Sequence, residues 1–451
     1  KMAIQNKIPN FDTRNKLDYS IFMKKVAFHT LGCKLNFAES SSLAGIFIQN
    51  DYQQVSFKEF ADVYVINTCT VTQVAEKKCR NAIRQANKIN PEATIAVIGC
   101  FAQLQPKEIS EIEGVDIILG NADKHKLFDY LNNKERFSEH WKEVKNIDDV
   151  KEFVPSYSTG DRTRSFLKIQ DGCDYFCTYC AIPFARGRSR SDTVATTVEK
   201  AYELAKEGKK EVVLTGVNIG DFGKHQNETF FDLIKELDKV EPIKRYRISS
   251  IEPNLITEEI IDWVKESRSF LPHFHIPLQA GTNFLLERMK RKYNRELFAD
   301  RIKYINHIMP NAFIAADIIV GFPGDNEEEF ASTIEFIESL PLSALHVFTY
   351  SERPNALSIN FDGKIPVNIR KKHSLILQEI SNKKKKEFYN RNIGYKGSIL
   401  WESDNENGMM FGFTDNYIRV ARIFDEKYIN TITQESLDKL SNNGDYFLIP
   451  N

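Results

Sequence analysis

The sequence contains no apolar run that approaches the ~20 residues a membrane-spanning helix requires. Residues 1–22 are polar and lack the apolar core of a signal peptide. Seven cysteines in 451 residues are too sparse, and odd in number, for a secreted disulfide scaffold. The formal net charge of -1 gives no overall attraction to nucleic acid. We therefore expect a cytoplasmic globular protein, with no membrane partner, whose thiols bind metal, do redox chemistry or pack in a core.

The length predicts roughly three domains at about 150 residues each. Residues 1–22 precede a methionine, Met23, that leads straight into an apolar strand pattern. We interpret them as an extension and expect the fold to begin at Met23.

Three apolar strand patterns in the first hundred residues each end at a cysteine, namely Cys33, Cys69 and Cys100. Helix-like stretches at 36–50 and 74–88 separate them, and this alternation predicts a parallel sheet with helices on its faces. Because the carboxyl ends of parallel strands meet at one edge, we expect the three cysteines to lie close together.

Residues 136–165 show no clear periodicity and are predicted to be a linker. Strand and helix patterns then alternate again, and six βα units in series predict a partial (β/α)6 barrel with its site at the carboxyl ends of the strands. The strand patterns cover 165–170, 211–218, 246–253, 273–279, 313–322 and 344–350. Beyond Gly394 the segments are short, aromatic and β-branched, which predicts a small β-barrel. The predicted fold class is thus α/β and multidomain.

A second cysteine group, "CDYFCTYC", contains Cys173, Cys177 and Cys180 just after the first barrel strand. Three thiolates on a four-iron cluster leave one iron without a protein ligand, and that iron can take the amino and carboxylate groups of a small molecule. A structural zinc site is the alternative, but zinc sites usually present two closely spaced pairs, and only Cys177 and Cys180 form one here.

The C-x3-C-x2-C group after the first strand of a βα barrel resembles the radical S-adenosylmethionine (SAM) enzymes. The resemblance implies a [4Fe-4S] cluster whose reduced form cleaves SAM to a 5′-deoxyadenosyl radical. It also implies SAM-binding roles for residues in "TYC", "LTGVN", "SSIEP" and "ADIIVGFPGD", namely Tyr179, Thr215, Gly216, Asn218, Glu252, Asp317 and Gly321.

The strings "TLGCKLN", "NTCTVT" and "GCFAQ" resemble the amino-terminal domain of the radical-SAM methylthiotransferases. This implies a second [4Fe-4S] cluster with an open iron, held by Cys33, Cys69 and Cys100. The implied domains are a methylthiotransferase domain at 23–140, a radical-SAM barrel at 160–392 and a TRAM domain at 393–451. Cys79 matches no ligand position and is interpreted as a helix-packing residue.

Within this family, strings such as "GCKLNFAESS" and "HIPLQAGTNFLLERMKRKY" look most like the branch that modifies N6-threonylcarbamoyladenosine (t6A) at tRNA position 37. The resemblance implies methylthio transfer to C2 in two SAM-dependent steps by a monomer. It also implies three partners: the tRNA anticodon stem-loop, an electron donor such as flavodoxin or ferredoxin, and a sulfur donor.

Other functions remain open at this point. The isopentenyladenosine tRNA enzyme and the ribosomal-protein aspartate enzyme are close alternatives. A non-catalytic RNA-binding iron–sulfur redox protein belongs to another class, but ferredoxins tie every iron to the protein, whereas two open-iron trios and a full barrel favour an enzyme.

Local charge suggests where RNA could bind. Residues 364–396 contain ten Lys or Arg and two Glu, and Arg186, Arg188 and Arg190 follow the barrel cysteines. These groups fit either phosphate contacts or solvated faces. Residues 396–451 are acidic, with five basic and nine acidic residues, so RNA contact there would need a basic face with Arg419 and Arg422 or aromatic stacking, for example by Trp401. Arg353 is a candidate for a carboxylate or phosphate contact or a structural arginine.

Overall fold

The structure is a computed structural model that describes residues 23–70, 73–132, 141–158 and 163–450. The predicted extension at 1–22 lies outside the described residues. Within the described ranges, no helix is long and apolar enough to cross a membrane.

The amino-terminal domain is a parallel sheet of six strands in the order β2-β1-β3-β4-β5-β6. The alternation of strands and helices predicted it. Both faces are covered, and the central strand β3 is buried along its whole length, as expected for a parallel strand between two helical layers. The elements are β1 (Lys24–Thr30), α1 (Lys34–Gln49), β2 (Tyr52–Val55), β3 (Val63–Thr68), α2 (Gln73–Ile89), β4 (Thr94–Gly99), α3 (Cys100–Leu104), α4 (Pro106–Ser110), β5 (Ile117–Leu119), α5 (Leu127–Asn132) and β6 (Trp141–Glu143).

The linker prediction for 136–165 is wrong for two short segments. Strand β6 pairs in parallel with β5, and β7 (Ser156–Tyr157) pairs antiparallel with the first barrel strand. Strands of two or three residues are too short to show a period of two, so no sequence pattern marked them.

The central domain contains the six predicted βα units. Its strands form two hydrogen-bonded groups, β12-β11-β8-β7 and β13-β14-β15, which a bridge between Ser250 and His275 connects. The strands are β8 (Arg164–Lys168), β11 (Glu211–Thr215), β12 (Arg245–Ile248), β13 (His273–His275), β14 (Phe313–Val320) and β15 (Ala344–Thr349). The helices are α7 (Val194–Lys206), α8 (Phe230–Asp238), α9 (Glu258–Glu266), α10 (Asn283–Arg288), α11 (Arg295–Ile308), α12 (Glu327–Glu338) and α13 (Val367–Arg391).

Local sequence explains where several of these helices begin. Thr193, Thr229 and Thr257 accept backbone hydrogen bonds as N-caps of α7, α8 and α9, which satisfies donors that have no partner inside the helix. Strand β14 shows how the barrel has two faces. Ile314, Ala316, Ile318 and Val320 pack in the core beneath the helices, so the alternate side chains, including Asp317, point to the other face.

The carboxyl-terminal domain is one curled sheet in the order β19-β16-β17-β18-β21-β20, and among the described residues its edge strands β19 and β20 do not pair with each other. It is therefore an open half-barrel, which agrees with the small all-β domain predicted for this end of the chain. Trp401 is fully buried in its core, so this residue is not free to stack on RNA. The strands are β16 (Lys396–Glu406), β17 (Met409–Thr414), β18 (Arg419–Ile423), β19 (Ile432–Ser436), β20 (Lys439–Leu440) and β21 (Phe447–Leu448).

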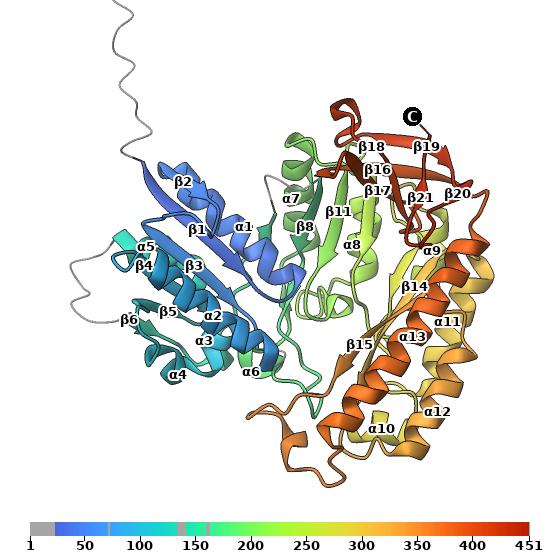
Figure 1. Cartoon of the computed structure of the whole chain (residues 1–451), viewed down its shortest axis with the longest axis horizontal. Helices are drawn as coiled ribbons and strands as arrows, with labels where there is room; N and C mark the ends of the chain where they lie inside the picture. Colours follow the sequence, from blue (N-terminus) through green and yellow to red (C-terminus); the bar gives the residue numbers. More distant parts are fainter. Residues whose placement is uncertain (1–22, 71–72, 133–140, 159–162, 451) are drawn as a thin grey trace, which may run out of the picture.

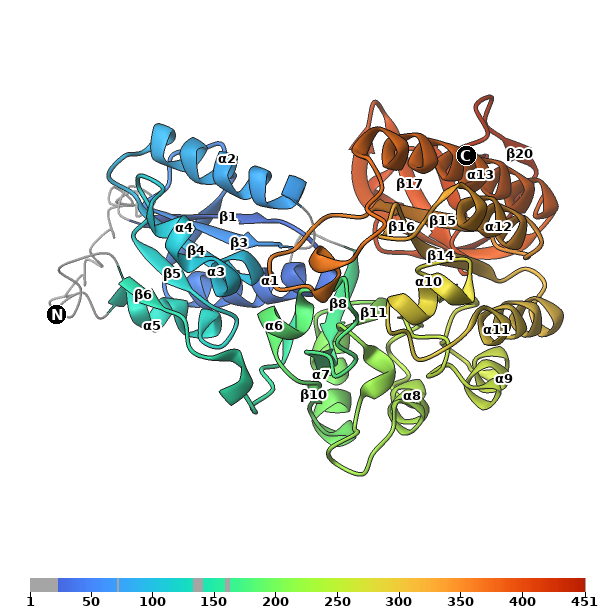
Figure 2. The same cartoon turned by 90° about the horizontal axis from the view of Figure 1, so that it is seen from below.

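Both outer domains are attached to the barrel (Figures 1 and 2). Helix α1 lies between the amino-terminal sheet and the β7–β8 edge of the barrel, where Ser42 Oγ accepts a hydrogen bond from the Tyr157 backbone N–H at 2.9 Å. On the other side, Arg245 and Arg247 donate to backbone carbonyls of the carboxyl-terminal sheet and pair with the fully buried Glu211. The barrel is thus the central body that positions both neighbours.

Candidate active site

The barrel trio lies in the loop between β9 (Gln170–Asp171) and α6 (Ile182–Arg186). Backbone N–H groups point at two of its sulfurs, with Tyr175 N 3.5 Å from Cys173 Sγ and Ile182 N 3.4 Å from Cys180 Sγ. Burial raises the pKa of the Cys180 thiol to about 12 and raises the pKa of Cys173 as well. These thiols would ionise only on binding a metal centre, and the donors around them fit a thiolate-ligated cluster.

Arg291 connects the trio to the predicted SAM site. Its guanidinium donates to Cys177 Sγ at 3.0 Å and to the Tyr179 hydroxyl at 3.2 Å, and it forms an ion pair with Glu252. No sequence pattern marked this residue, because it lies in a loop after α10, more than a hundred residues from the cysteines. Its side chain gives the trio a positive partner and holds Glu252 beside it.

Other residues with predicted SAM roles lie at the carboxyl ends of neighbouring strands. Thr215 ends β11, and the backbone N–H groups of Val217 and Asn218 donate to Gln170 Oε1 at 2.9 and 2.7 Å. A Cβ on Gly216 would lie 2.9 Å from the Gln170 carbonyl, so only glycine fits this tight turn. The SAM contacts themselves stay predictions.

Two predicted SAM residues have other visible partners. Gly321 follows β14 with φ +75°, and a Cβ there would collide with the Arg370 side chain, so packing requires glycine. Asp317 lies inside β14, not at its end, and contacts two histidines.

The three amino-terminal cysteines follow the parallel strands β1, β3 and β4 at one edge of the sheet, and their joint binding of a cluster stays a prediction. Cys33 precedes α1, Cys69 follows β3 and Cys100 follows β4. A Cβ built on Gly32 would lie 2.9 Å from Cys69 Sγ, so the turn before Cys33 touches Cys69 directly. Asn121 Nδ2 lies 3.5 Å from Cys100 Sγ.

Cys79 lies in α2, fully buried in the amino-terminal core, with its sulfur 4.0 Å from the Cys69 carbonyl oxygen. Burial raises its pKa to about 11. These contacts agree with the predicted packing role, although the residue lies near the trio.

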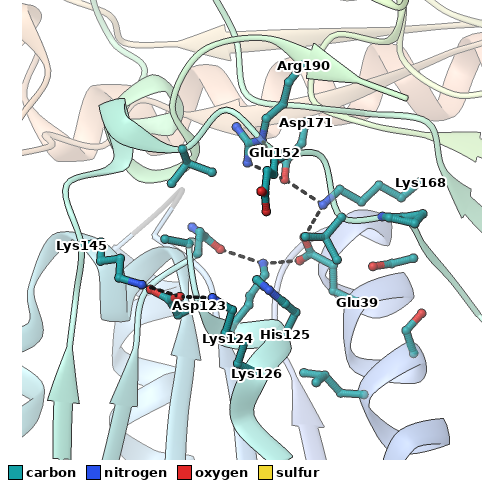
Figure 3. A pocket seen from close by; sticks show the side chains of 18 of the residues that line it. Glu39, Asp123, Lys124, His125, Lys126, Lys145, Glu152, Lys168, Asp171 and Arg190 are labelled. Carbon is teal, nitrogen blue, oxygen red and sulfur yellow. Dashed lines mark hydrogen bonds and ion pairs between the residues drawn. The ribbon is translucent and has the colours of Figure 1, made fainter. Parts of the chain in front are cut away.

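A buried charge network lies behind the amino-terminal trio, at the junction with the barrel (Figure 3). Glu39 of α1 accepts hydrogen bonds from Lys168 at 3.1 Å and Arg186 at 3.0 Å and pairs with Lys124. Asp171 pairs with Lys168 and Arg186 at 2.8 and 2.9 Å, and with Arg190. Two carboxylates thus face four cations.

This network touches the cysteine site through two asparagines. Lys124 Nζ donates to Asn121 Oδ1 at 2.7 Å, and Arg186 donates to Asn36 Oδ1 at 2.6 Å. The excess positive charge stabilises negative charge next to it, and three thiolates on a cluster would place negative charge there. The donor set therefore fits an anionic iron–sulfur centre.

The same contacts correct one expectation. Arg186 and Arg190 are 1% and 9% exposed and are held by Glu39 and Asp171, so they are not free to bind RNA phosphates. Arg188 lies between them in sequence and has 63% of its side chain exposed. It remains a candidate for RNA contact.

The basic segment at 364–396 contains the whole of α13, and its charged residues have two different roles. Arg370 is buried and pairs with Glu352, while Lys384 is buried and donates to the Leu340 carbonyl at 2.8 Å. Both are structural. The exposed cations Lys371, Lys372, Lys383, Lys386 and Arg391 remain candidates for phosphate contacts.

A cavity of about 240 Å³ lies beside Cys180, where the barrel meets the loop after Cys69. Tyr179 and Cys180 line it from the barrel trio, and Thr70, next to Cys69, lines it from the amino-terminal domain. Asp317 lines it from inside the barrel. Arg353 lies at its border but is buried in an ion pair with Glu76 of α2, so this arginine joins the two domains.

Comparison with known proteins agrees with this division of the chain. Residues 25–120 match a family described as "Uncharacterized protein family UPF0004", and residues 167–337 match the "Radical SAM superfamily". A "Threonylcarbamoyladenosine tRNA methylthiotransferase MtaB" from Bacillus subtilis is 40% identical over 430 residues, covering 92% of this chain and 94% of that protein. A protein of the same name from Aquifex aeolicus is 39% identical, covering 88% and 96%.

Two further relatives are more distant. A "tRNA-2-methylthio-N(6)-dimethylallyladenosine synthase" from Clostridium tetani is 32% identical, covering 90% of this chain and 93% of that protein. The solved structure of the radical SAM methyltransferase TsrM from Kitasatospora setae superposes with a TM-score of 0.53 at 12% identity, covering 94% of this chain and 85% of that one. At that identity the likeness concerns the fold alone.

Proposed function

Because the chain belongs to the radical-SAM methylthiotransferase family, in the branch of the MtaB proteins, we propose that it adds a methylthio group to C2 of t6A at tRNA position 37. It is a tRNA methylthiotransferase that uses a [4Fe-4S] cluster and SAM. The proposal concerns the t6A substrate, the second cluster and the two SAM-dependent steps. Higher identity to the relatives named for threonylcarbamoyladenosine than to those named for dimethylallyladenosine supports this substrate.

The observation that carries the proposal is the cavity beside Cys180, which a residue of the amino-terminal domain also lines. Replacing C–H by C–SCH3 on an aromatic ring needs a group that accepts the hydrogen and a sulfur that binds the same carbon. A base that enters this cavity contacts Cys180 of the barrel trio and Thr70, the residue after Cys69. A barrel cluster alone would not require the loop after Cys69 to line the same cavity.

The chemistry balances with two SAM molecules. One provides the 5′-deoxyadenosyl group, which leaves with the C2 hydrogen as 5′-deoxyadenosine, and the other provides the methyl group. Sulfur comes from a sulfur donor, and a flavodoxin- or ferredoxin-like protein delivers the electrons. When bound, the barrel cluster would supply the electron that cleaves SAM, and the amino-terminal cluster would hold the sulfur that is transferred.

The chain's own residues position these groups and keep water out. Cys173, Cys177 and Cys180 would hold the barrel cluster, with Arg291 donating to the Cys177 sulfur. The buried pair of Arg291 and Glu252 fixes the loops around it. The Arg353–Glu76 pair closes the amino-terminal domain onto the barrel beside the cavity, which excludes solvent from the reacting base.

Two cysteine variants test the proposal. We expect Cys177→Ala to abolish formation of 5′-deoxyadenosine from SAM, and Cys69→Ala to retain it while losing methylthio transfer to a t6A-containing anticodon stem-loop. Nucleoside mass spectrometry after anaerobic reconstitution measures both. Iron should fall from about eight to about four per chain in each variant. Methylthiolation of t6A by Cys69→Ala, or of a dimethylallyl hairpin in preference to t6A by the wild type, contradicts the proposal.

A further inference from the structure

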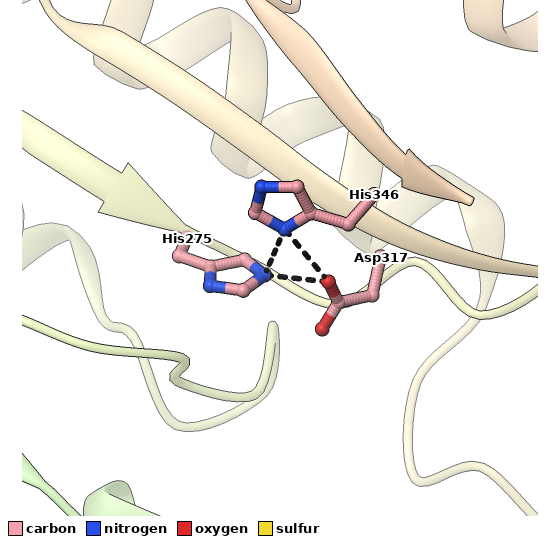
Figure 4. Close-up of side chains that lie close together, drawn as sticks. All are labelled: His275, Asp317 and His346. Atoms are coloured by element: carbon pink, nitrogen blue, oxygen red, sulfur yellow. Dashed lines mark hydrogen bonds and ion pairs between the residues drawn. The ribbon is translucent and has the colours of Figure 1, made fainter. Parts of the chain in front are cut away.

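Three side chains from adjacent barrel strands meet at one point beside the cavity (Figure 4). His275 Nε2 lies 2.7 Å from Asp317 Oδ1, His346 Nδ1 lies 3.1 Å from the same oxygen, and the two nitrogens are 3.2 Å apart. They belong to β13, β14 and β15, and Asp317 and His346 are directly paired in register. Among the described residues, this is the group of potential ligands close enough together to hold a single metal ion.

Hydrogen bonds alone bring like groups close together in this arrangement. Each imidazole nitrogen either donates or accepts a hydrogen bond. If His275 Nε2 and His346 Nδ1 both donate to Asp317, their two N–H groups lie side by side, with the nitrogens 3.2 Å apart. If one of these nitrogens accepts a hydrogen bond from the other, its second hydrogen-bond partner, the Asp317 carboxylate, faces a lone pair. A metal ion takes a lone pair from all three atoms at once. With zinc bonds of about 2.0–2.1 Å, tetrahedral ligand atoms lie about 3.3 Å apart, close to the separations seen here.

We propose that His275, Asp317 and His346 bind one divalent transition-metal ion whose open coordination position faces the substrate cavity. Two imidazoles and one carboxylate favour zinc or ferrous iron over magnesium or calcium. All three ligands come from one wall of the barrel, so a fourth ligand enters from the other side. Asp317 lines the cavity that Cys180 also lines, and half of the His346 side chain is exposed.

The geometry points to an oxygen of the N6 substituent as that fourth ligand, an extension that rests on the proposed function. The threonylcarbamoyl group carries a carboxylate and a hydroxyl, whereas a dimethylallyl group carries no oxygen. A metal at this point therefore distinguishes the two nucleosides by chemistry. This assignment replaces the SAM contact that the sequence suggested for Asp317.

The surroundings agree with a preformed site. The three side chains stand on a hydrogen-bonded parallel sheet, which fixes their separation without any loop movement.

Zinc binding to the cluster-loaded protein tests the site without turnover. After equilibration with Zn²⁺ and dialysis, we expect one zinc per chain in the wild type and in His307→Ala, an exposed histidine on α11, and none in His346→Ala or Asp317→Asn. X-ray absorption at the zinc edge should show nitrogen and oxygen ligands. Iron content near eight per chain shows that each variant is folded. Equal zinc in His346→Ala, or sulfur ligation, overturns the site.

Hairpin binding tests the extension. Zn²⁺ should tighten binding of a t6A hairpin and leave a dimethylallyl hairpin unchanged, and His346→Ala should remove that difference. Zinc that binds to this site but has no effect on either hairpin overturns the recognition role. If instead no methylthio-t6A is ever formed while zinc stoichiometry behaves as expected, the proposed function fails and the metal site stands.

Discussion

Glu39→Gln is the substitution whose effect follows most directly from the contacts. Glu39 and Lys124 belong to the amino-terminal domain, whereas Lys168 and Arg186 belong to the barrel side of the junction. These cations hold the pKa of Glu39 well below its usual range even though its burial alone would raise it. The carboxylate is therefore the anion that joins the cations of both domains.

The free-energy cost of Glu39→Gln depends on how the remaining buried charges adjust. Removing one partner of a buried ion pair costs about 3–5 kcal/mol, because the other charge remains buried without compensation. Burial lowers the pKa of Lys124 to about 8 although Glu39 raises it, so without Glu39 this lysine loses its proton more readily at pH 7. We therefore expect Glu39→Gln to cost an amount at the lower end of this range, about 3 kcal/mol. This corresponds to roughly hundredfold weaker docking of the two domains.

Hydrogen exchange of α1 and β7–β8 measures that docking, and product analysis measures its consequence. Exchange of peptides covering residues 34–49 should accelerate up to about a hundredfold. Methylthio transfer should fall while 5′-deoxyadenosine formation stays near the wild-type level, because SAM cleavage needs only the barrel. The matched control is Glu379→Gln, at an exposed position on α13. Unchanged exchange in Glu39→Gln would refute the role of the network.

Two other predictions concern the buried residues Glu211 and Cys79. Glu211 is fully buried, which opposes its ionisation, but Arg247, Arg245 and Arg164 lower its pKa from 4.5 to about 2. The ionised Glu211 therefore stabilises the folded protein by about 3 kcal/mol above pH 4.5, and this stabilisation is lost as the pH falls towards 2. Denaturant unfolding of the wild type and of Glu211→Gln should therefore differ at pH 7 and converge below pH 4.5, and a constant difference would contradict the shift. Cys79→Ala should keep about eight irons per chain, measured by iron analysis. It should destabilise the amino-terminal domain by about 1 kcal/mol, measured by thermal unfolding. Loss of about four irons in this variant would show that Cys79 is a cluster ligand.

Periodicity determined much of the fold, because the alternation of strands and helices predicted the parallel sheet and the βα barrel. The position of a cysteine after each of three strands predicted that Cys33, Cys69 and Cys100 lie at one edge of the sheet. Spacing along a single loop suggested that Cys173, Cys177 and Cys180 bind one cluster. These features depend on neighbours in sequence or on the shared edge of a parallel sheet, which a pattern records.

The tertiary structure decided which charges are available and which are not. Arg186 pairs with Glu39 across 147 positions, and Arg353 pairs with Glu76 across 277, so two candidate ligand-binding arginines became links between domains. The meeting of His275, Asp317 and His346 likewise depends on strand register. No local period encodes such contacts, because they arise only when separate domains and strands have packed together.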